Sequence, residues 1–268
     1  MLRDITLGQY YPGDSLIHKL DPRTKLVGTL VFIISLFLFR SFACYLAVTL
    51  FLAAVIRTSK VPFRFMVKGL KSIMILLMIT MVFNLFLTPG TAVIHIWKLQ
   101  ITKEGILQAV FMAIRLIYLI IGSTVMTLTT TPNHLTDGME KGLSPLKKLH
   151  VPVHEVAMMM SIALRFIPIL MEETDKIMKA QMARGADFES GGLIQKAKSL
   201  VPLLVPLFIS AFRRANDLAM AMEARGYRGG EGRTKMKPLI YQKRDYGAYL
   251  ILAGYLVCIC VIGRLSPI

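Results

Sequence analysis

Hydrophobic residues in this chain are gathered into long continuous runs that are separated by charged segments. The first run covers residues 26–56 and is interrupted only at Arg40-Ser41. Because about 20 apolar residues let one helix span a bilayer, this run predicts either two short spans or one long tilted helix. Just before the run, Asp21-Pro22 predicts the start of a helix, with Asp21 as its N-cap and Pro22 in its first turn.

Three more apolar runs predict membrane-spanning helices at residues 72–87, about 106–130 and about 246–262. The Pro89-Gly90 turn signal closes the first of them. Residues 91–105 follow with β-branched residues around Trp97, which predicts a small hairpin or an interfacial loop. The pattern predicts an all-α integral membrane protein with about five transmembrane helices.

Composition agrees with this class of protein. Hydrophobic residues make up 54% of the chain and charged residues only 18%, which argues against an ordinary soluble domain. Cys44, Cys258 and Cys260 lie in apolar runs without metal-type spacing, so we expect neither a disulfide framework nor a metal site. The formal net charge of +16 is compatible with binding to nucleic acid, to an anionic membrane surface or to acidic proteins. The distribution of the charged residues along the chain decides among these partners.

Basic residues follow the positive-inside rule if the N-terminus lies in the cytoplasm. The segments then assigned to the cytoplasm hold most of the 32 Lys and Arg: four before residue 26, five in residues 57–71 and 18 in residues 133–245. A single helix at residues 26–56 would move the five-charge loop to the outside, so the distribution favours two spans. With five spans, the C-terminus lies outside.

Residues 133–245 also hold 12 of the 16 acidic residues. Two stretches inside this segment, residues 153–171 and 200–212, are apolar but contain charges or prolines. If both crossed the membrane, the basic residues between them would lie outside, so we predict that neither spans it.

Residues 133–245 are therefore expected to form a cytoplasmic domain of long helices, inserted before the last span. Its breakers limit helices at residues 133–148, 153–184 and 193–225. Prolines inside the two longer helices predict bends at Pro168, Pro202 and Pro206. The predicted division of the chain is residues 1–132 for the N-terminal segment and first four spans, 133–245 for the cytoplasmic domain, and 246–268 for the last span.

Two of these helices end in the same tripeptide, Ala183-Arg184-Gly185 and Ala224-Arg225-Gly226. A Gly after the last turn of a helix accepts a left-handed conformation, and an Arg in that turn complements the negative end of the helix dipole. Two unrelated helix caps could therefore have this same sequence. Two copies, each with methionines close by, favour a functional pair instead. A planar cation at a helix end suits a groove on a soluble partner that offers carboxylate or carbonyl acceptors.

The paired motif and other segments along nearly the whole chain resemble the transmembrane T component of energy-coupling-factor transporters. Those transporters are ABC-type importers of vitamins and transition-metal ions. The segments that carry the resemblance, besides the two Ala-Arg-Gly motifs, are Gly8-Gln9-Tyr10, Pro12-Gly13-Asp14-Ser15-Leu16-Ile17-His18, Leu20-Asp21-Pro22-Arg23-Thr24-Lys25, Leu128-Thr129-Thr130-Thr131-Pro132 and Leu164-Arg165-Phe166-Ile167-Pro168.

The resemblance implies a non-catalytic scaffold without a cofactor, in the bacterial cell membrane. Family members hold a membrane-embedded, substrate-binding S component and dock two cytoplasmic ATPase subunits through crossed coupling helices. By this resemblance, Arg184 and Arg225 each enter a groove on one ATPase, and ATP-driven closure of the ATPase pair reorients the S component. The implied function is uptake of vitamins or other micronutrients, with ATP hydrolysed by the partners. The chain itself contains no Walker A sequence.

Other candidate residues have simpler interpretations. Arg115 in the fourth span is expensive in hydrocarbon, and we favour a structural role within the helix bundle over a substrate-binding one. Asn84 in the third span is expected to bond between helices. His150 and His154 are four residues apart, but Pro152 between them breaks the helical face that a metal pair needs.

Three other functions agree less well with the sequence than a scaffold does. The glycine-rich residues 225–233 could pass for an RNA-binding tract, but one aromatic and a position beside a membrane helix favour a flexible linker and no nucleic-acid partner. A stand-alone transporter or channel would need converging polar groups in the spans, where only Arg115 and Asn84 are evident. A membrane enzyme would need clustered acids or histidines near the membrane, whereas these acids alternate with basic residues.

Overall fold

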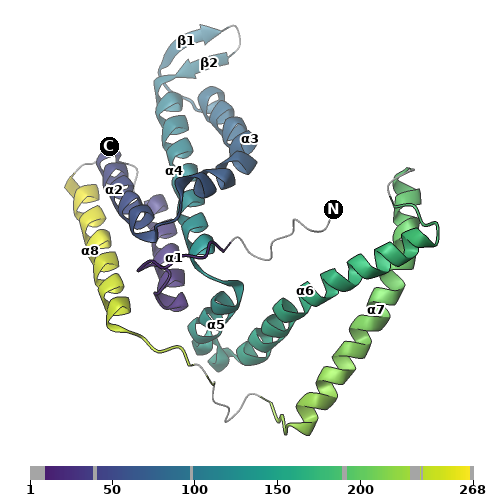
Figure 1. The fold of residues 1–268 in the computed structure, drawn as a ribbon. Helices are drawn as coiled ribbons and strands as arrows, with labels where there is room; N and C mark the ends of the chain where they lie inside the picture. Colours follow the sequence, from purple (N-terminus) through teal and green to yellow (C-terminus); the bar gives the residue numbers. More distant parts are fainter. Residues whose placement is uncertain are drawn as a thin grey trace. The chain divides into compact units, whose positions relative to one another are not determined.

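The computed structural model describes residues 10–38, 41–96, 99–188, 192–229, 236 and 238–265. Gly8-Gln9, Arg40, Trp97 and Arg233, which the sequence singled out, lie outside the described residues. Nearly all of the described chain is helical (Figure 1). The elements in chain order are α1 (Pro22–Leu38), α2 (Phe42–Ser59), α3 (Phe63–Leu87), β1 (Ala92–Ile96), β2 (Leu99–Thr102), α4 (Lys103–Thr129), α5 (Pro132–Gly142), a 3-10 helix (Ser144–Leu149), α6 (Val153–Ala183), α7 (Leu193–Ala224) and α8 (Lys243–Leu265).

Backbone contacts divide the chain into two compact units. The bundle unit comprises Gly8–Gly138 and Leu239–Ile268, and therefore contains α1 to α4, the hairpin and α8. The insert unit comprises the described residues of Met139–Pro238, which contain α6 and α7. The predicted domain boundaries after residues 132 and 245 remain predictions, since the two units rest on backbone contacts alone.

Two separate helices, α1 and α2, occupy the first apolar run, as predicted. The N-cap at Asp21 is also confirmed, because its Oδ1 accepts a hydrogen bond from the backbone N–H of Arg23 at 2.9 Å. Of the two alternatives for residues 91–105, a hairpin or an interfacial loop, the structure has the hairpin: β1 pairs antiparallel with β2. Thr102 then caps α4, since its Oγ1 accepts from the backbone N–H of Gly105 at 3.0 Å.

Two predicted boundaries are wrong. The basic segment at residues 57–71 is mostly helical rather than a loop, because α2 continues to Ser59 and α3 already begins at Phe63. Its apolar residues pack in the protein: Met66 is fully buried. The helix expected at residues 133–148 ends at Gly142, and a 3-10 helix follows. Pro145 explains this break, since it lacks an N–H and its ring clashes with the preceding helical turn.

The core of the bundle unit lies where α1, α2, α4 and α8 meet. Its buried side chains include Phe32, Leu52, Val125 and Ile259, one from each of these helices. Gly122 of α4 lets α1 approach closely, because a Cβ there would come within 2.5 Å of the Phe32 ring. Long apolar side chains on the outer faces stay exposed, as expected of helices that face lipid rather than water.

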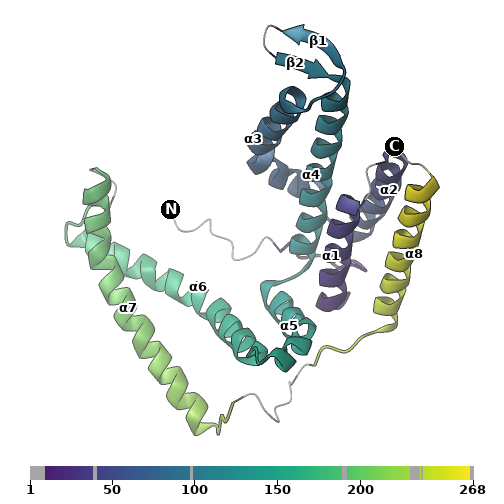
Figure 2. The same ribbon diagram turned by 180° about the vertical axis from the view of Figure 1, so that it is seen from behind.

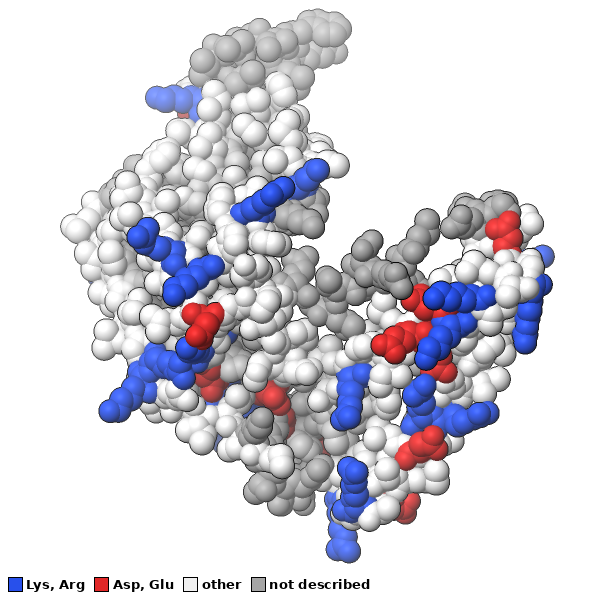
Figure 3. All heavy atoms as spheres, viewed as in Figure 1, with Lys and Arg blue, Asp and Glu red and all other residues white. Residues whose placement is uncertain are grey.

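Four described helices, α2, α4, α6 and α8, are long and apolar enough to cross a membrane. A fifth crossing results if the two parts of α3, Phe63–Lys71 and Ile73–Leu87, count as one, although they are bent by 60°. α1 has 17 residues, at the lower limit for a spanning helix. On the face in Figure 3, most of the bundle unit is uncharged, whereas basic and acidic side chains alternate over α6 and α7. The chain is a multi-pass membrane protein.

α6 meets the length and composition criteria for a membrane span, although we predict that it lies outside the bilayer. Both long helices of the insert unit run on through their prolines: Pro168 lies inside α6, and Pro202 and Pro206 lie inside α7. The bends expected at these prolines remain predictions. The placement of α6 on the cytoplasmic side of the membrane likewise remains a prediction, which is based on the charge distribution along the chain.

Candidate functional site

The two Ala-Arg-Gly motifs lie at the ends of α6 and α7, which form an antiparallel pair. Figures 1 and 2 show the two helices running in opposite directions, so that their C-terminal ends lie at opposite ends of the pair. Contacts agree: Glu173 of α6 bonds to Ser210 near the middle of α7, whereas Met158 near the start of α6 lines a groove with Arg225. The two cationic tips are therefore held apart by the helices.

The end of α6 is a Schellman turn, a common way of closing a helix. The backbone N–H of Gly185 donates to the carbonyl of Met182 at 3.0 Å, and that of Ala186 donates to Gln181 at 2.9 Å. Gly185 has φ of +87°, in the left-handed region where a side chain would be strained. Arg184 is the last residue with near-helical backbone and is exposed.

The end of α7 repeats this geometry residue for residue. Gly226 N–H donates to Glu223 at 2.9 Å, Tyr227 N–H donates to Met222 at 3.0 Å, and Gly226 has φ of +70°. The backbone of Arg225 (φ −87°, ψ 9°) nearly matches that of Arg184 (φ −88°, ψ 6°). The tripeptides thus present two exposed guanidinium groups from the same local frame, and within the described residues neither group has a hydrogen bond or ion pair.

A polar contact joins α6 to α7 away from both tips. The Glu173 carboxylate accepts hydrogen bonds from Arg214 Nε at 3.1 Å and Nη2 at 2.8 Å, and a further one from the Ser210 hydroxyl. Beside it, Phe166 of α6 and Leu218 of α7 line an apolar groove between the two helices. Sequence reasoning missed this contact, because no local signal pairs residues 37 and 41 positions apart.

We expect Glu173→Gln to destabilise the α6–α7 pair by about 1 kcal/mol, because a neutral amide loses the charge-assisted bonds to a partly exposed Arg214. Thermal unfolding of the purified protein in detergent measures this. The exposed neighbour Glu172 supplies the matched control, Glu172→Gln, which should leave stability unchanged. Equal losses from the two substitutions would contradict the assigned contact.

A buried carboxylate ties the start of α8 to the start of α1. Asp245 is 1% exposed; its Oδ1 accepts from the backbone N–H of Asp21 at 2.8 Å and its Oδ2 accepts from that of Gln242 at 2.8 Å. The second bond is half of a capping box at the start of α8. Gln242 and Asp245 do not match the usual capping-box sequence, and the link from Asp245 to Asp21 depends on the tertiary fold.

Arg23 extends this network to the chain segment that precedes α8. Its guanidinium binds both carboxylate oxygens of Asp21, donates to the Leu239 carbonyl at 3.2 Å and stacks over the Tyr241 ring at 3.9 Å. Burial raises the pKa of Asp21, but the hydrogen bonds and charge of Arg23 outweigh it, so the net pKa lies below the ordinary value. The segment just before α8 is thus bound to the start of α1 within the bundle unit.

Arg115 is 8% exposed and packs inside the bundle unit. Its Nε donates to the Tyr45 hydroxyl at 3.2 Å, and its guanidinium lies 5.3 Å from the centre of the Phe37 ring. These contacts fit the structural role that the sequence favoured. The expectation for Asn84 is wrong, because its amide donates to the Thr80 carbonyl one turn earlier in α3 rather than to another helix.

The two histidines do not form a metal pair in the structure. His154 Nδ1 bonds to Glu140 Oε1 at 2.8 Å, and His150 lies in a left-handed turn with φ of 58°. Among the described residues, no three His, Cys, Asp or Glu side chains are grouped as metal ligands would be. The glycine-rich segment at residues 225–233 lies partly outside the described residues.

Comparison with known proteins identifies the family. The family model described as "Cobalt transport protein", CbiQ, matches residues 13–236. A Clostridium kluyveri protein named "Energy-coupling factor transporter transmembrane protein EcfT" is 59% identical over 267 residues, which cover 99% of this chain and 98% of the relative.

Two more relatives carry the same name. The protein of Thermosediminibacter oceani is 55% identical over 249 residues, covering 93% of this chain and 94% of its own. The protein of Bacillus subtilis is 51% identical over 246 residues, covering 91% and 93%. These identities extend over the bundle unit and the paired-motif helices alike. This chain therefore belongs to the CbiQ/EcfT family and is an EcfT-type transmembrane component of an energy-coupling factor transporter.

Proposed function

We propose that the chain is the non-catalytic scaffold and coupling subunit of its transporter, passing ATP-driven movement of two cytoplasmic ATPase subunits to a membrane-embedded S component. The observation that carries this proposal is the pair of equivalent helix ends at Arg184 and Arg225. Two matching cationic tips on one chain imply two matching grooves, as two copies of one type of ATPase would offer. The cargo is then a vitamin or another micronutrient bound by the S component.

The antiparallel arrangement supports a role as a lever. Tips at opposite ends of the α6–α7 pair can be held by two separate subunits, and a change in the distance between those subunits would shift or rotate both helices. The Glu173–Arg214 contact makes the pair respond as one piece. Exposed Met182 and Met220 near the tips add flexible, polarizable contact surface for the partners.

We propose that the chain lies in the bacterial cell membrane. Its N-terminus and the α6–α7 pair are on the cytoplasmic side, and its C-terminus is outside. The excess of Lys and Arg in the insert supports it. Single-cysteine variants at residues 184 and 225 provide a test. In intact cells, a membrane-impermeant maleimide should label neither position, whereas labelling from outside would reject the topology.

Co-purification in mild detergent from the native host tests the whole proposal. We expect two ATPase subunits and one or more small membrane proteins to be recovered with the tagged chain. Recovery of the chain as a stable homo-oligomer without ATPases would instead favour a stand-alone transporter or channel.

Purified alone, the chain should hydrolyse no ATP above a mock preparation, because the proposal assigns that chemistry to its partners. The measurement is phosphate release in detergent and after reconstitution. Purification from cells that lack the partner ATPases excludes contamination of the sample by those ATPases. Activity that persists in that preparation would reject the scaffold function.

A further inference from the structure

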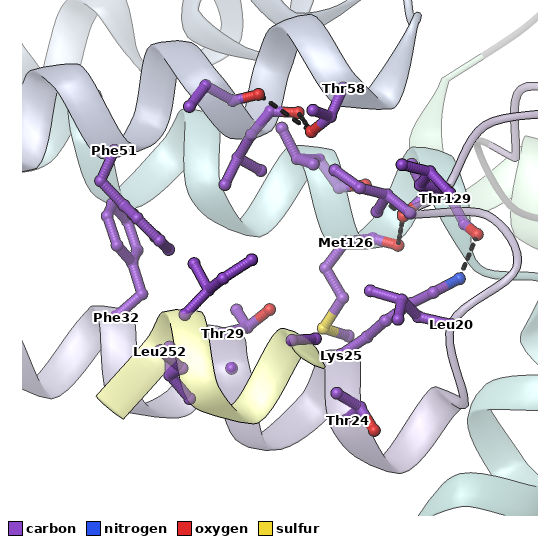
Figure 4. Close-up of a pocket in the computed structure, with 18 of the residues that line it drawn as sticks. Leu20, Thr24, Lys25, Thr29, Phe32, Phe51, Thr58, Met126, Thr129 and Leu252 are labelled. Atoms are coloured by element: carbon purple, nitrogen blue, oxygen red, sulfur yellow. Dashed lines mark hydrogen bonds between the residues drawn. The ribbon is translucent and has the colours of Figure 1, made fainter. Parts of the chain in front are cut away.

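The bundle unit contains a cavity of about 430 Å³ that is lined by α1, α2, α4 and α8 and is open to its surroundings. Volumes of this size hold small-molecule ligands or a substantial part of a larger one. Most of its wall is apolar: Phe32, Phe51, Met126 and Leu252 lie around it in Figure 4. The cavity therefore suits a hydrocarbon group.

Basic residues line the cavity near the starts of α1 and α8, which the hydrogen bond between Asp245 and Asp21 holds together. Lys25 near the start of α1, Thr129 at the end of α4 and Arg244 near the start of α8 all line it. Figure 4 shows Lys25 beside Thr129, away from Phe32 and Phe51. The cavity is thus amphipathic along its length, with its cationic end where α1 and α8 begin.

The cations at this end keep their capacity to bind an anion. Lys25 Nζ donates to the carbonyls of Thr129 at 2.8 Å and His18 at 3.1 Å, which uses two of its three N–H groups. Arg244 bonds to the neutral amide oxygen of Gln242, so its charge is not matched by that contact. The two nearby carboxylates, Asp21 and Asp245, interact with the charge of Lys25, while their oxygens accept hydrogen bonds from Arg23 and from backbone N–H groups.

Two glycines show that the cavity has free space beside the helices. A Cβ added at Gly28 of α1 or at Gly247 of α8 would have no atom within 4 Å, and both residues line the cavity. Gly122, which also lines it, differs because a Cβ there would meet Phe32. The first carbon of a side chain at residue 28 or 247 therefore meets no other atom, and we expect a larger side chain there to take up space in the cavity.

We propose that this cavity binds one phospholipid with an anionic headgroup, with one of its two acyl chains between the four helices and its phosphate beside Lys25 and Arg244. The chain lies in a bilayer, which supplies molecules that combine a long apolar tail with a phosphate. In the proposed topology the cationic end faces the cytoplasmic leaflet, where anionic lipids attract basic side chains. This site is separate from the Ala-Arg-Gly tips and does not depend on their proposed role.

Native mass spectrometry of the full purified chain tests the proposal, with phosphatidylglycerol or phosphatidylcholine added after delipidation. We expect one bound phosphatidylglycerol, with at least fivefold lower occupancy by phosphatidylcholine. Gly28→Leu and Gly247→Leu should each lower phosphatidylglycerol occupancy at least fivefold, because the new side chain fills the cavity. Arg244→Gln should reduce the preference for phosphatidylglycerol.

Gly254→Leu is the matched control: residue 254 lies on α8, a Cβ there also meets nothing within 4 Å, and it does not line the cavity. The phosphatidylglycerol occupancy of the Gly254→Leu variant should equal that of the unmodified chain. The melting temperature of each variant without added lipid identifies any variant that fails to fold. If one of the two cavity variants fails to fold, the other still tests the proposal. Unchanged occupancy in both cavity variants, or equal binding of the two lipids by the unmodified chain, would overturn the proposal.

Discussion

The double variant Arg184→Ala/Arg225→Ala is expected to lose capture of the partner ATPases and, with it, ATP-driven uptake. Each substitution removes a planar cation that can make two parallel hydrogen bonds to a carboxylate or to carbonyls. Anchors of this kind contribute about 2 kcal/mol or more to an interface, so the affinity for each ATPase should fall roughly 30-fold or more. Pull-down of the ATPases and vitamin uptake into proteoliposomes measure the two effects.

Each single variant should retain part of the binding, because the other tip still holds its partner. Arg184→Lys/Arg225→Lys separates charge from geometry: lysine keeps the charge but lacks the fork of donors, and we expect an intermediate loss. Arg213→Ala, an exposed arginine within α7, is the matched control. Normal ATPase capture together with normal uptake in the double variant would remove the basis for the proposed coupling role.

The same variants should insert into the membrane at the normal level. Both tips lie on the exposed ends of α6 and α7 and contribute no side chain to the core of the bundle unit. The two glycines behave differently from the arginines, since φ of +87° at Gly185 and +70° at Gly226 strains any other residue there. Loss of the arginine variants from the membrane fraction would point to a folding role instead.

Asp245→Ala should strongly destabilise the bundle unit. It leaves the backbone N–H groups of Asp21 and Gln242 without an acceptor in a buried place, at a cost of about 3 kcal/mol. It also separates the start of α8 from the start of α1. We expect the melting temperature in detergent to fall by several degrees.

Asp245→Asn refines this prediction, because it keeps one acceptor oxygen but turns an NH₂ group toward a backbone donor. Its loss of stability should be intermediate. Asp217→Ala, at an exposed position on α7, controls for removal of a carboxylate. If the buried and exposed substitutions lowered the melting temperature equally, the link between α1 and α8 would contribute nothing measurable.

Local patterns in the sequence were sufficient for most of the helices. Long apolar runs and their breakers predicted separate α1 and α2 helices and the ends of α6 and α7 next to Gly185 and Gly226, whereas residues 91–105 were left as either a hairpin or an interfacial loop. Local patterns failed where an amphipathic segment was taken for a loop, at residues 57–71, and where Pro145 ended a helix early. In both places packing or ring geometry, rather than mean hydropathy, decided the outcome.

The sequence by itself determined the membrane class, the family and the two capped tripeptides, because apolar run length and helix-end chemistry act between residues close along the chain. Only the tertiary structure decided which distant groups meet: Asp245 with Asp21, Glu173 with Arg214, and the cations with the apolar cavity. Such pairings depend on how helices pack and cross, and neither hydropathy nor spacing along the chain specifies that geometry.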